Sequence, residues 1–254
     1  MVPQAQEDQE SKVKRTLCWY SAGVTSMVAA MKAKECGPIT VAYCDTGGEH
    51  PDNVRFIKDC ERLLGQEIII LRSEKYESIW DVFEKTRYLS GVKGARCTTE
   101  MKKLVRRGFE DLENDIQVFG FDNSEKIRAE KFVANNPEVT AWFPLIEGNI
   151  SKQECLDIIA AAGIELPAMY KMGYKNNNCI GCVKGQSGYW NKIRVDFPEV
   201  FDRMAKQERL LNVALNKSYA GDGKRKRVFL DELDPTAGRY DSELEIKCGL
   251  ICGE

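Results

Sequence analysis

Apolar and polar residues alternate in two rhythms along the first 150 positions of the chain. Five short runs rich in apolar and β-branched residues predict strands, at residues 16–20, 39–44, 66–71, 116–121 and 139–143. Between them, helical spacing dominates: residues 27–36 end at Gly37-Pro38, a helix stop signal, and Phe56, Ile57, Cys60, Leu63 and Leu64 recur with a helical period. This order predicts βαβ units, and hence an α/β fold with an open, mostly parallel, doubly wound sheet.

The pattern changes after residue 150. Ser151 and Glu154 form a capping box that opens a helix ending at Gly163. Beyond Val183 the strand pattern disappears, and we expect two or three helices between residues 189 and 216, then a loop with the basic run 224–227, then an acidic tail.

The chain is therefore predicted to have one main domain and a helical extension. The predicted parts are a polar N-terminal tail over residues 1–15, an α/β domain over 16–187, and a helical extension with a cysteine-bearing tail over 188–254.

Composition changes this picture little. The chain has 254 residues, and its net charge of −2 gives no global reason to expect nucleic acid binding. The first fifteen residues lack the apolar stretch of a signal peptide, and the longest aliphatic run, residues 68–71, is far shorter than the roughly 20 residues that cross a bilayer. We expect a cytoplasmic protein with no membrane partner.

Ten cysteines are a high count for that compartment, where disulfides are rare. Five lie within predicted strands or helices and are expected to be small buried side chains: Cys18, Cys36, Cys44, Cys60 and Cys155. The other five are candidates for chemistry: Cys97 after a Gly-rich basic loop, Cys179 and Cys182 in a C-x-x-C, and Cys248 and Cys252 near the C-terminus.

Two loops that follow predicted strands are candidates for nucleotide binding. In the first, Ser21-Ala22-Gly23-Val24-Thr25-Ser26, small residues let backbone N–H groups approach a phosphate at a helix N-terminus. In the second, Asp45-Thr46-Gly47, a carboxylate at a strand's end can accept hydrogen bonds from a ribose or adenine. The first loop is equally compatible with an ordinary strand-to-helix turn; for the second, the spacing to the following strand favours binding over a plain turn.

These loops resemble the phosphoadenosine phosphosulfate (PAPS) reductase family, within the ATP pyrophosphatase (PP-loop) superfamily. The first is similar to S-G-G-x-x-S, with Val24-Thr25 where ATP-cleaving members carry Lys-Asp; the second, continued by Pro51-Asp52, is similar to D-T-G-x-x-x-P-E. A third match runs from Leu166-Pro167 through Met169-Tyr170 and Gly173-Tyr174 into Cys179-Ile180-Gly181-Cys182. The resemblance covers about residues 16–183 and the last six or seven residues. It implies that residues 16–187 form a nucleotide-binding domain with the Rossmann-like PP-loop fold.

The resemblance implies an anion-binding set. The segment around Cys97 is similar to the family's C-C-x-x-x-K, which assigns Lys102 to the anion, while Lys103, Arg106 and Arg107 are expected on a solvated helix face. Arg128 stands at the matching end of the fourth-strand loop. Phe121-Asp122 replaces the double Arg of many reductases, a departure that counts against a sulfonucleotide substrate.

The resemblance also implies a metal centre and a nucleophile. Cys97, Cys179 and Cys182 are expected to hold a [4Fe–4S] cluster, with zinc as the alternative; Cys252 or Cys248 would supply a fourth ligand, or the site would stay open. The C-terminal tail resembles E-C-G-L-H, with Lys247 in place of Glu and Ile251 in place of His, which makes Cys248 the candidate nucleophile. His50, the single histidine, is given no catalytic role.

The implied function is an oxidoreductase of sulfur metabolism. It would bind an adenine nucleotide (APS, PAPS or ATP) and reduce APS or PAPS to sulfite, with a thioredoxin-like dithiol as donor. Two alternatives remain open: an iron–sulfur-dependent sulfurtransferase that thiolates tRNA or DNA, with residues 224–227 on phosphates, and a non-catalytic regulator that binds a nucleotide or cluster.

Overall fold

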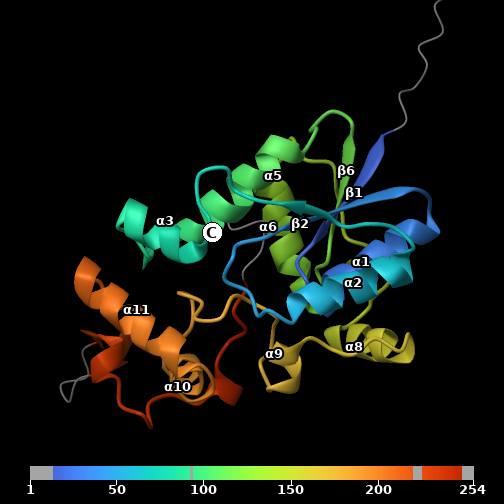
Figure 1. Ribbon diagram of the computed structural model, residues 1–254. Helices are drawn as coiled ribbons and strands as arrows, with labels where there is room; N and C mark the ends of the chain where they lie inside the picture. Colours follow the sequence, from blue (N-terminus) through green and yellow to red (C-terminus); the bar gives the residue numbers. More distant parts are fainter. Residues whose placement is uncertain (1–13, 92–93, 220–224, 248–254) are drawn as a thin grey trace, which may run out of the picture.

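The computed structural model describes residues 14–91, 94–219 and 225–247 (Figure 1). Its centre is a five-stranded sheet in the order β3-β2-β1-β6-β7, and every neighbouring pair is parallel. The strands are β1 (Arg15–Tyr20), β2 (Ile39–Cys44), β3 (Ile69–Leu71), β6 (Asp115–Phe119) and β7 (Ala141–Trp142). The predicted α/β class is confirmed, although β3 and β7 are shorter than their apolar runs suggested.

Eleven helices accompany these strands within the described residues. They are α1 (Val24–Glu35), α2 (Asn53–Leu64), α3 (Ile79–Thr86), α4 (Arg96–Thr98), α5 (Leu104–Phe109), α6 (Lys126–Asn135), α7 (Pro144–Glu147), α8 (Lys152–Ala161), α9 (Ala168–Lys171), α10 (Ser187–Asp196) and α11 (Pro198–Leu211). The capping box predicted at Ser151 and Glu154 opens α8: the Ser151 side chain accepts from the Glu154 N–H, and the Glu154 carboxylate accepts from the Ser151 N–H.

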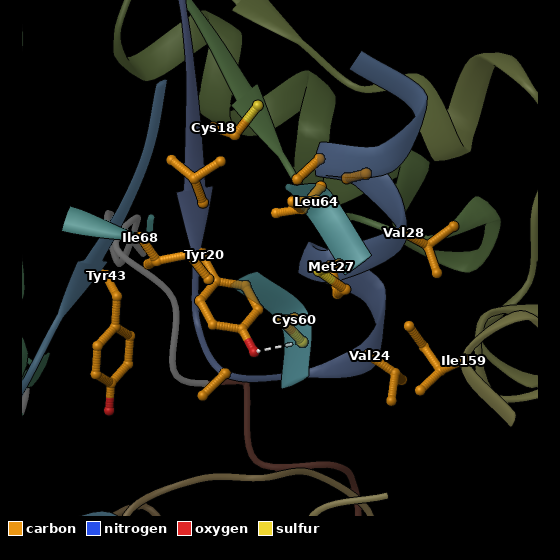
Figure 2. Close-up of a cluster of buried hydrophobic side chains, with 14 of the residues drawn as sticks. Cys18, Tyr20, Val24, Met27, Val28, Tyr43, Cys60, Leu64, Ile68 and Ile159 are labelled. Atoms are coloured by element: carbon orange, nitrogen blue, oxygen red, sulfur yellow. Dashed lines mark hydrogen bonds between the residues drawn. The ribbon is translucent and has the colours of Figure 1, made fainter. Parts of the chain in front are cut away.

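Alternate residues of β1 face opposite sides of the sheet, as the two-residue period of a strand requires. Cys18 and Tyr20 pack with α1, α2 and α8, whereas Leu17 and Trp19 pack with α5 and α6. Figure 2 shows the first of these cores, where the Tyr20 hydroxyl donates to Cys60 Sγ at 3.3 Å. Both faces are therefore buried, which explains why the strand sequences read as nearly continuous apolar runs.

A separate helical layer lies beside the sheet and is built from α3, α10 and α11 (Figure 1). Trp190, Ile193 and Met204 are fully buried in it. Two 3₁₀ turns, Leu230–Glu232 and Tyr240–Ser242, carry the chain across this layer and back towards the sheet. The two or three helices predicted for this region correspond to α10 and α11.

The predicted loop at the basic run 224–227 is wrong for its described part. Residues Arg225–Val228 form β9, which pairs antiparallel with β8 (Asn216–Tyr219). Lys217 lies opposite Arg227 and both are exposed, so the hairpin offers no alternating apolar face by which sequence patterning recognises a strand.

Two predictions about individual side chains are also wrong. Cys36 is exposed, because it follows the last turn of α1 instead of lying on that helix's buried face. Arg106 is only 3% exposed and is not on a solvated face: its guanidinium pairs with Glu110 at 3.4 Å, and burial lowers its pKa.

Candidate functional site

A cavity of about 120 Å³ lies beyond the carboxyl ends of β1 and β6. The chain leaves β1 towards β2 on one side, and β6 pairs with β1 on the other, so the cavity stands where the strand order reverses. Ligands of open α/β sheets bind at such a point. Four segments line it: residues 21–26, residues 119–122, residues 176–178 and residues 245–247.

The loop between β1 and α1 is shaped by hydrogen bonds among its own small residues. Ser26 Oγ accepts from the Ser21 N–H at 3.1 Å and donates to the Gly23 carbonyl at 2.9 Å. Ala22 has a left-handed φ of 55°, which is costly for a residue with a Cβ. The loop is thus held tightly around the N-terminus of α1, where backbone N–H groups favour an anion.

Gly120 permits the close approach that forms the floor of the cavity. A Cβ at this position would lie 2.4 Å from Ser26 Cα, so only glycine lets the end of β6 pack against the first turn of α1.

Asn177 joins this loop to the segment that precedes the C-x-x-C. Its side-chain amide donates to the Ala22 carbonyl at 2.7 Å and to Asn53 Oδ1 at 2.8 Å. Asn177 is buried, and within the described structure its Oδ1 atom has no hydrogen-bond partner. Because an unpaired buried polar atom is costly, a donor group on a ligand would find a favourable acceptor there.

Five of the charged side chains that line the cavity are paired with one another. Arg128 contacts Glu125 Oε1 at 2.6 Å and lies over the Phe121 ring at 4.3 Å, while Lys247 reaches the same carboxylate oxygen at 3.1 Å. On another wall, Lys152 contacts Glu245 at 3.0 Å. The lining therefore mixes cations with carboxylates.

The residues predicted for nucleotide binding divide into two groups. Those that line the cavity are Ser21, Gly23, Ser26, Lys102 and Arg128, with Ala22 buried behind them. The other group is the second loop: Asp45 accepts from the Gly47 N–H and from Arg72, and lines a separate hollow with Arg72.

Thr46, from that second loop, contacts the C-x-x-C instead of the cavity. Its Oγ1 lies 3.1 Å from Cys179 Sγ, and Glu49 Oε1 lies 3.5 Å from the same sulfur. The Tyr189 hydroxyl bridges the turn, accepting from the Cys182 N–H at 2.9 Å and donating to the Cys179 carbonyl at 3.3 Å.

Cys97, Cys179 and Cys182 all adjoin the core of the helical layer. Among the residues that the structure describes, however, no three His, Cys, Asp or Glu side chains form a group that could hold a metal ion. Cys248 and Cys252 lie outside the described residues. The cluster that the resemblance implies therefore stays a prediction, since its candidate fourth ligands lie outside the described residues, and we derive no chemical step through it.

Several residues of the cavity were not singled out from the sequence. Lys152, Asn177 and Glu245 line it, as does Tyr170, which was quoted only as part of a motif. Burial raises the pKa of Tyr170 to about 12, so its phenol remains a proton donor at neutral pH. The run Asn176-Asn177-Asn178 just before the C-x-x-C was the available signal, since three adjacent amides are unusual in a segment that is not a surface turn.

With this geometry established, comparison with known proteins places the chain. Residues 15–187 match the model of the phosphoadenosine phosphosulfate reductase domain, and the chain belongs to that family. Members of this family bind adenylated nucleotide substrates.

Two similar proteins are more distant. An uncharacterised protein of Methanocaldococcus jannaschii is 24% identical over 234 residues, which cover 85% of this chain and 45% of that protein, so the chain spans less than half of its relative's length. A crystal structure of PAPS reductase from Candida auris, in complex with phosphate, is 15% identical with a TM-score of 0.49, covering 67% of this chain and 82% of that one. No helix in the described part of the chain has both the length and the apolar character needed to span a membrane.

Proposed function

We propose that this protein is a sulfonucleotide reductase that converts APS or PAPS to sulfite. The observation that carries the proposal is the path of the C-terminal segment. Residues 245–247 line the cavity beyond β1 and β6, and Lys247 contacts Glu125 there, so the chain reaches the cavity wall one residue before Cys248.

The cavity supplies groups suited to an adenylated sulfate. The first turn of α1 presents backbone N–H groups to the phosphate, and the buried Asn177 Oδ1 accepts a hydrogen bond from a hydroxyl or amine of the nucleoside. Lys102 and Arg128 lie on the wall where the sulfate end would be neutralised.

The chemistry would proceed in two balanced steps. The Cys248 thiolate attacks the sulfate sulfur, an S–S bond forms, and the S–O bond to the nucleotide phosphate breaks. The nucleotide leaves as AMP from APS or as adenosine 3′,5′-bisphosphate from PAPS. A thioredoxin-like dithiol then attacks Cys248 Sγ, releasing sulfite and taking up the cysteine as a mixed disulfide. Its second thiol frees Cys248, so the donor ends as a disulfide after a two-electron oxidation.

A specific observation favours a second candidate, the thiolation of a nucleic acid. A wider hollow of about 890 Å³ adjoins the cavity and shares Arg128 and Lys152 with it. Lys103, Lys184 and Lys247 also line it, and Asp122 and Glu245 are its acidic side chains, so the surplus is basic. Such a surface would suit a polyanionic acceptor.

The decisive experiment measures sulfite release from APS and from PAPS with a dithiol donor. We expect turnover in the wild type and none in Cys248→Ser, with nucleotide affinity retained, because the serine hydroxyl is a far weaker nucleophile than a thiolate. Cys36→Ser is the matched control, since Cys36 is exposed at the end of α1, away from the cavity. Turnover by Cys248→Ser would remove this residue from the mechanism.

If neither sulfonucleotide reacts, the same preparations discriminate the alternatives. Salt-sensitive binding of tRNA or DNA together with sulfur transfer would support the thiolation enzyme. Nucleotide binding without turnover on any of these substrates would favour a regulator.

We further propose that Cys97, Cys179 and Cys182 hold a [4Fe–4S] cluster, with zinc as the alternative, once a ligand from outside the described residues, such as Cys252, joins them. We expect about four iron atoms and four acid-labile sulfides per chain after anaerobic purification, on the stoichiometry of such a cluster. Both should be lost in Cys97→Ala and kept in Cys36→Ala. Absence of iron after reconstitution, with one zinc per chain, would replace the cluster by zinc; absence of both metals would contradict any metal at this site.

A further inference from the structure

We propose that Lys152 and Asn176 form an anion subsite on the cavity wall, that Glu245 of the C-terminal segment occupies it as an internal ligand, and that a bound sulfate or phosphate displaces Glu245. The subsite is separate from the predicted anion residues Lys102 and Arg128.

The contacts at Glu245 are those of a bound anion. Lys152 Nζ donates to both carboxylate oxygens, at 3.0 and 3.1 Å, and Asn176 Nδ2 donates to Oε2 at 3.4 Å. A carboxylate held by an ammonium and an amide has the charge and the donor arrangement that also hold sulfate or phosphate.

Lys152 is held in place independently of Glu245. Its Nζ also donates to the Lys175 carbonyl and to Asn176 Oδ1 at 2.8 Å, and its side chain is only 20% exposed. It is the first residue of α8, behind the Ser151 capping box, which fixes the backbone from which it extends. The ammonium therefore stays in position when the carboxylate leaves, and the subsite is preformed.

The charge balance of the cavity explains why an anion would replace Glu245. Its lining carries four basic side chains (Lys102, Arg128, Lys152 and Lys247) and three acidic ones (Asp122, Glu125 and Glu245). Removing Glu245 leaves four basic side chains against two acidic ones, an excess of positive charge that a sulfate or phosphate dianion neutralises. At 38% exposure, the Glu245 side chain is itself open to water, so its ion pair with Lys152 is weak and little free energy is lost when it leaves.

Glu245 also belongs to the segment that leads to Cys248. The Ile246 carbonyl accepts from Asn178 Nδ2 at 2.9 Å, and Lys184 Nζ donates to the Lys247 carbonyl at 3.2 Å. An anion that displaces Glu245 would loosen this segment while the nucleotide site fills. The identity of that anion as the sulfate end of a nucleotide rests on the proposed function, whereas the subsite itself does not.

The test uses the full chain and inorganic sulfate alone. Sulfate affinity is measured by calorimetry at low ionic strength, where charge effects are least screened. Glu245→Gln removes the internal anion but keeps the side-chain shape, and we expect roughly twofold to fivefold tighter sulfate binding, the range of a partly exposed ion pair. Lys152→Gln should weaken binding by at least a similar factor.

Lys171 and Glu165 provide a matched control pair. Lys171 Nζ contacts Glu165 Oε1, and neither residue lines the cavity. Lys171→Gln and Glu165→Gln should leave sulfate affinity unchanged. A second readout follows the segment: sulfate should speed amide hydrogen exchange across residues 244–247 in the wild type and have no effect on it in Lys152→Gln.

Two results would overturn the proposal: equal sulfate affinity in the wild type and Glu245→Gln, or unchanged affinity in Lys152→Gln. These results are independent of the proposed reductase activity. Sulfite formation with no change in sulfate affinity among the variants would support the reductase and reject the subsite. The expected changes in sulfate affinity without sulfite formation would support the subsite and reject the reductase.

Discussion

The sheet and the helical layer bury side chains equally well, yet they are held together differently. Around the sheet, one face is packed mainly with aliphatic and small residues and the other with a cluster of rings that includes Trp19, Phe119 and Phe132. The loops at the strand ends are shaped by hydrogen bonds among Ser, Asn and Gly. In the helical layer, Tyr174, Tyr189, Trp190 and Tyr240 pack edge to face against one another. The two regions therefore position different parts of the site: the sheet forms the cavity floor, and the helical layer positions the C-x-x-C and the C-terminal segment.

The largest expected effect is on the sheet side, at Gly120. Gly120→Ala would place a Cβ against the backbone of Ser26, and the resulting shift should destabilise the protein by roughly 3 kcal/mol or more and abolish nucleotide binding. Denaturant unfolding and nucleotide titration measure both. Gly108→Ala is the control, because a Cβ added there would meet no atom within 4 Å and alanine suits its helix. Equal effects of the two substitutions would contradict the close approach.

The next largest expected effect is a pH dependence of the free energy of unfolding that arises in the helical layer. Glu208 is fully buried in α11, and its two oxygens accept from the Leu215 and Leu230 N–H groups at 2.6 Å each. Burial raises its pKa to about 7 against these donors and against Arg209, while Asp231 adds to the rise.

Because an unfolded Glu ionises near pH 4.5, the unfolded chain loses the proton first. The free energy of unfolding should therefore fall as pH rises from about 4.5 to 7, by at most about 3 kcal/mol, and level off above. Glu208→Gln should remove this component, so the stability difference between wild type and variant, measured by denaturant unfolding from pH 5 to 8, should change over that window. Parallel stability curves would show that Glu208 does not titrate there.

The smallest expected effect on stability comes from removing one tyrosine hydroxyl in each region. Tyr189→Phe deletes two hydrogen bonds of the C-x-x-C turn and should cost about 1–2 kcal/mol of unfolding free energy. Tyr20→Phe deletes a single bond to the Cys60 sulfur and should cost less than about 1 kcal/mol. The reverse order, measured by thermal and denaturant unfolding, would mean that the turn is not held by Tyr189.

The sheet was predictable because its strands are buried on both faces, and α8 because it begins with a capping box. The β2 prediction, residues 39–44, agrees with the observed strand, and the capping box at Ser151 marks the start of α8. The hairpin of β8 and β9 was not predictable, since its pairing depends on backbone hydrogen bonds between polar strands that carry no periodic apolar signal.

The cavity was predictable only where local sequence determines it. The loop at residues 21–26 was found from its small residues, and it lines the cavity. The sequence also predicted that Asp45 binds the nucleotide, but in the structure its carboxylate accepts hydrogen bonds from Arg72 and from the Gly47 N–H. The Lys152–Glu245 pair joins positions 93 residues apart, and such a pairing follows from the tertiary path of the chain and not from any local pattern.

The attachment of the C-terminal segment through its main chain has a consequence for how this end of the protein can vary. Asn178 and Lys184 donate hydrogen bonds to the carbonyls of Ile246 and Lys247, which are groups that every residue type carries. Substitution of the Ile246 side chain leaves those contacts available. A single residue inserted or deleted between Glu243 and Lys247, in contrast, shifts every later carbonyl away from its partner. The position of the chain as far as Lys247 therefore depends on the number of residues in this segment more than on their side chains.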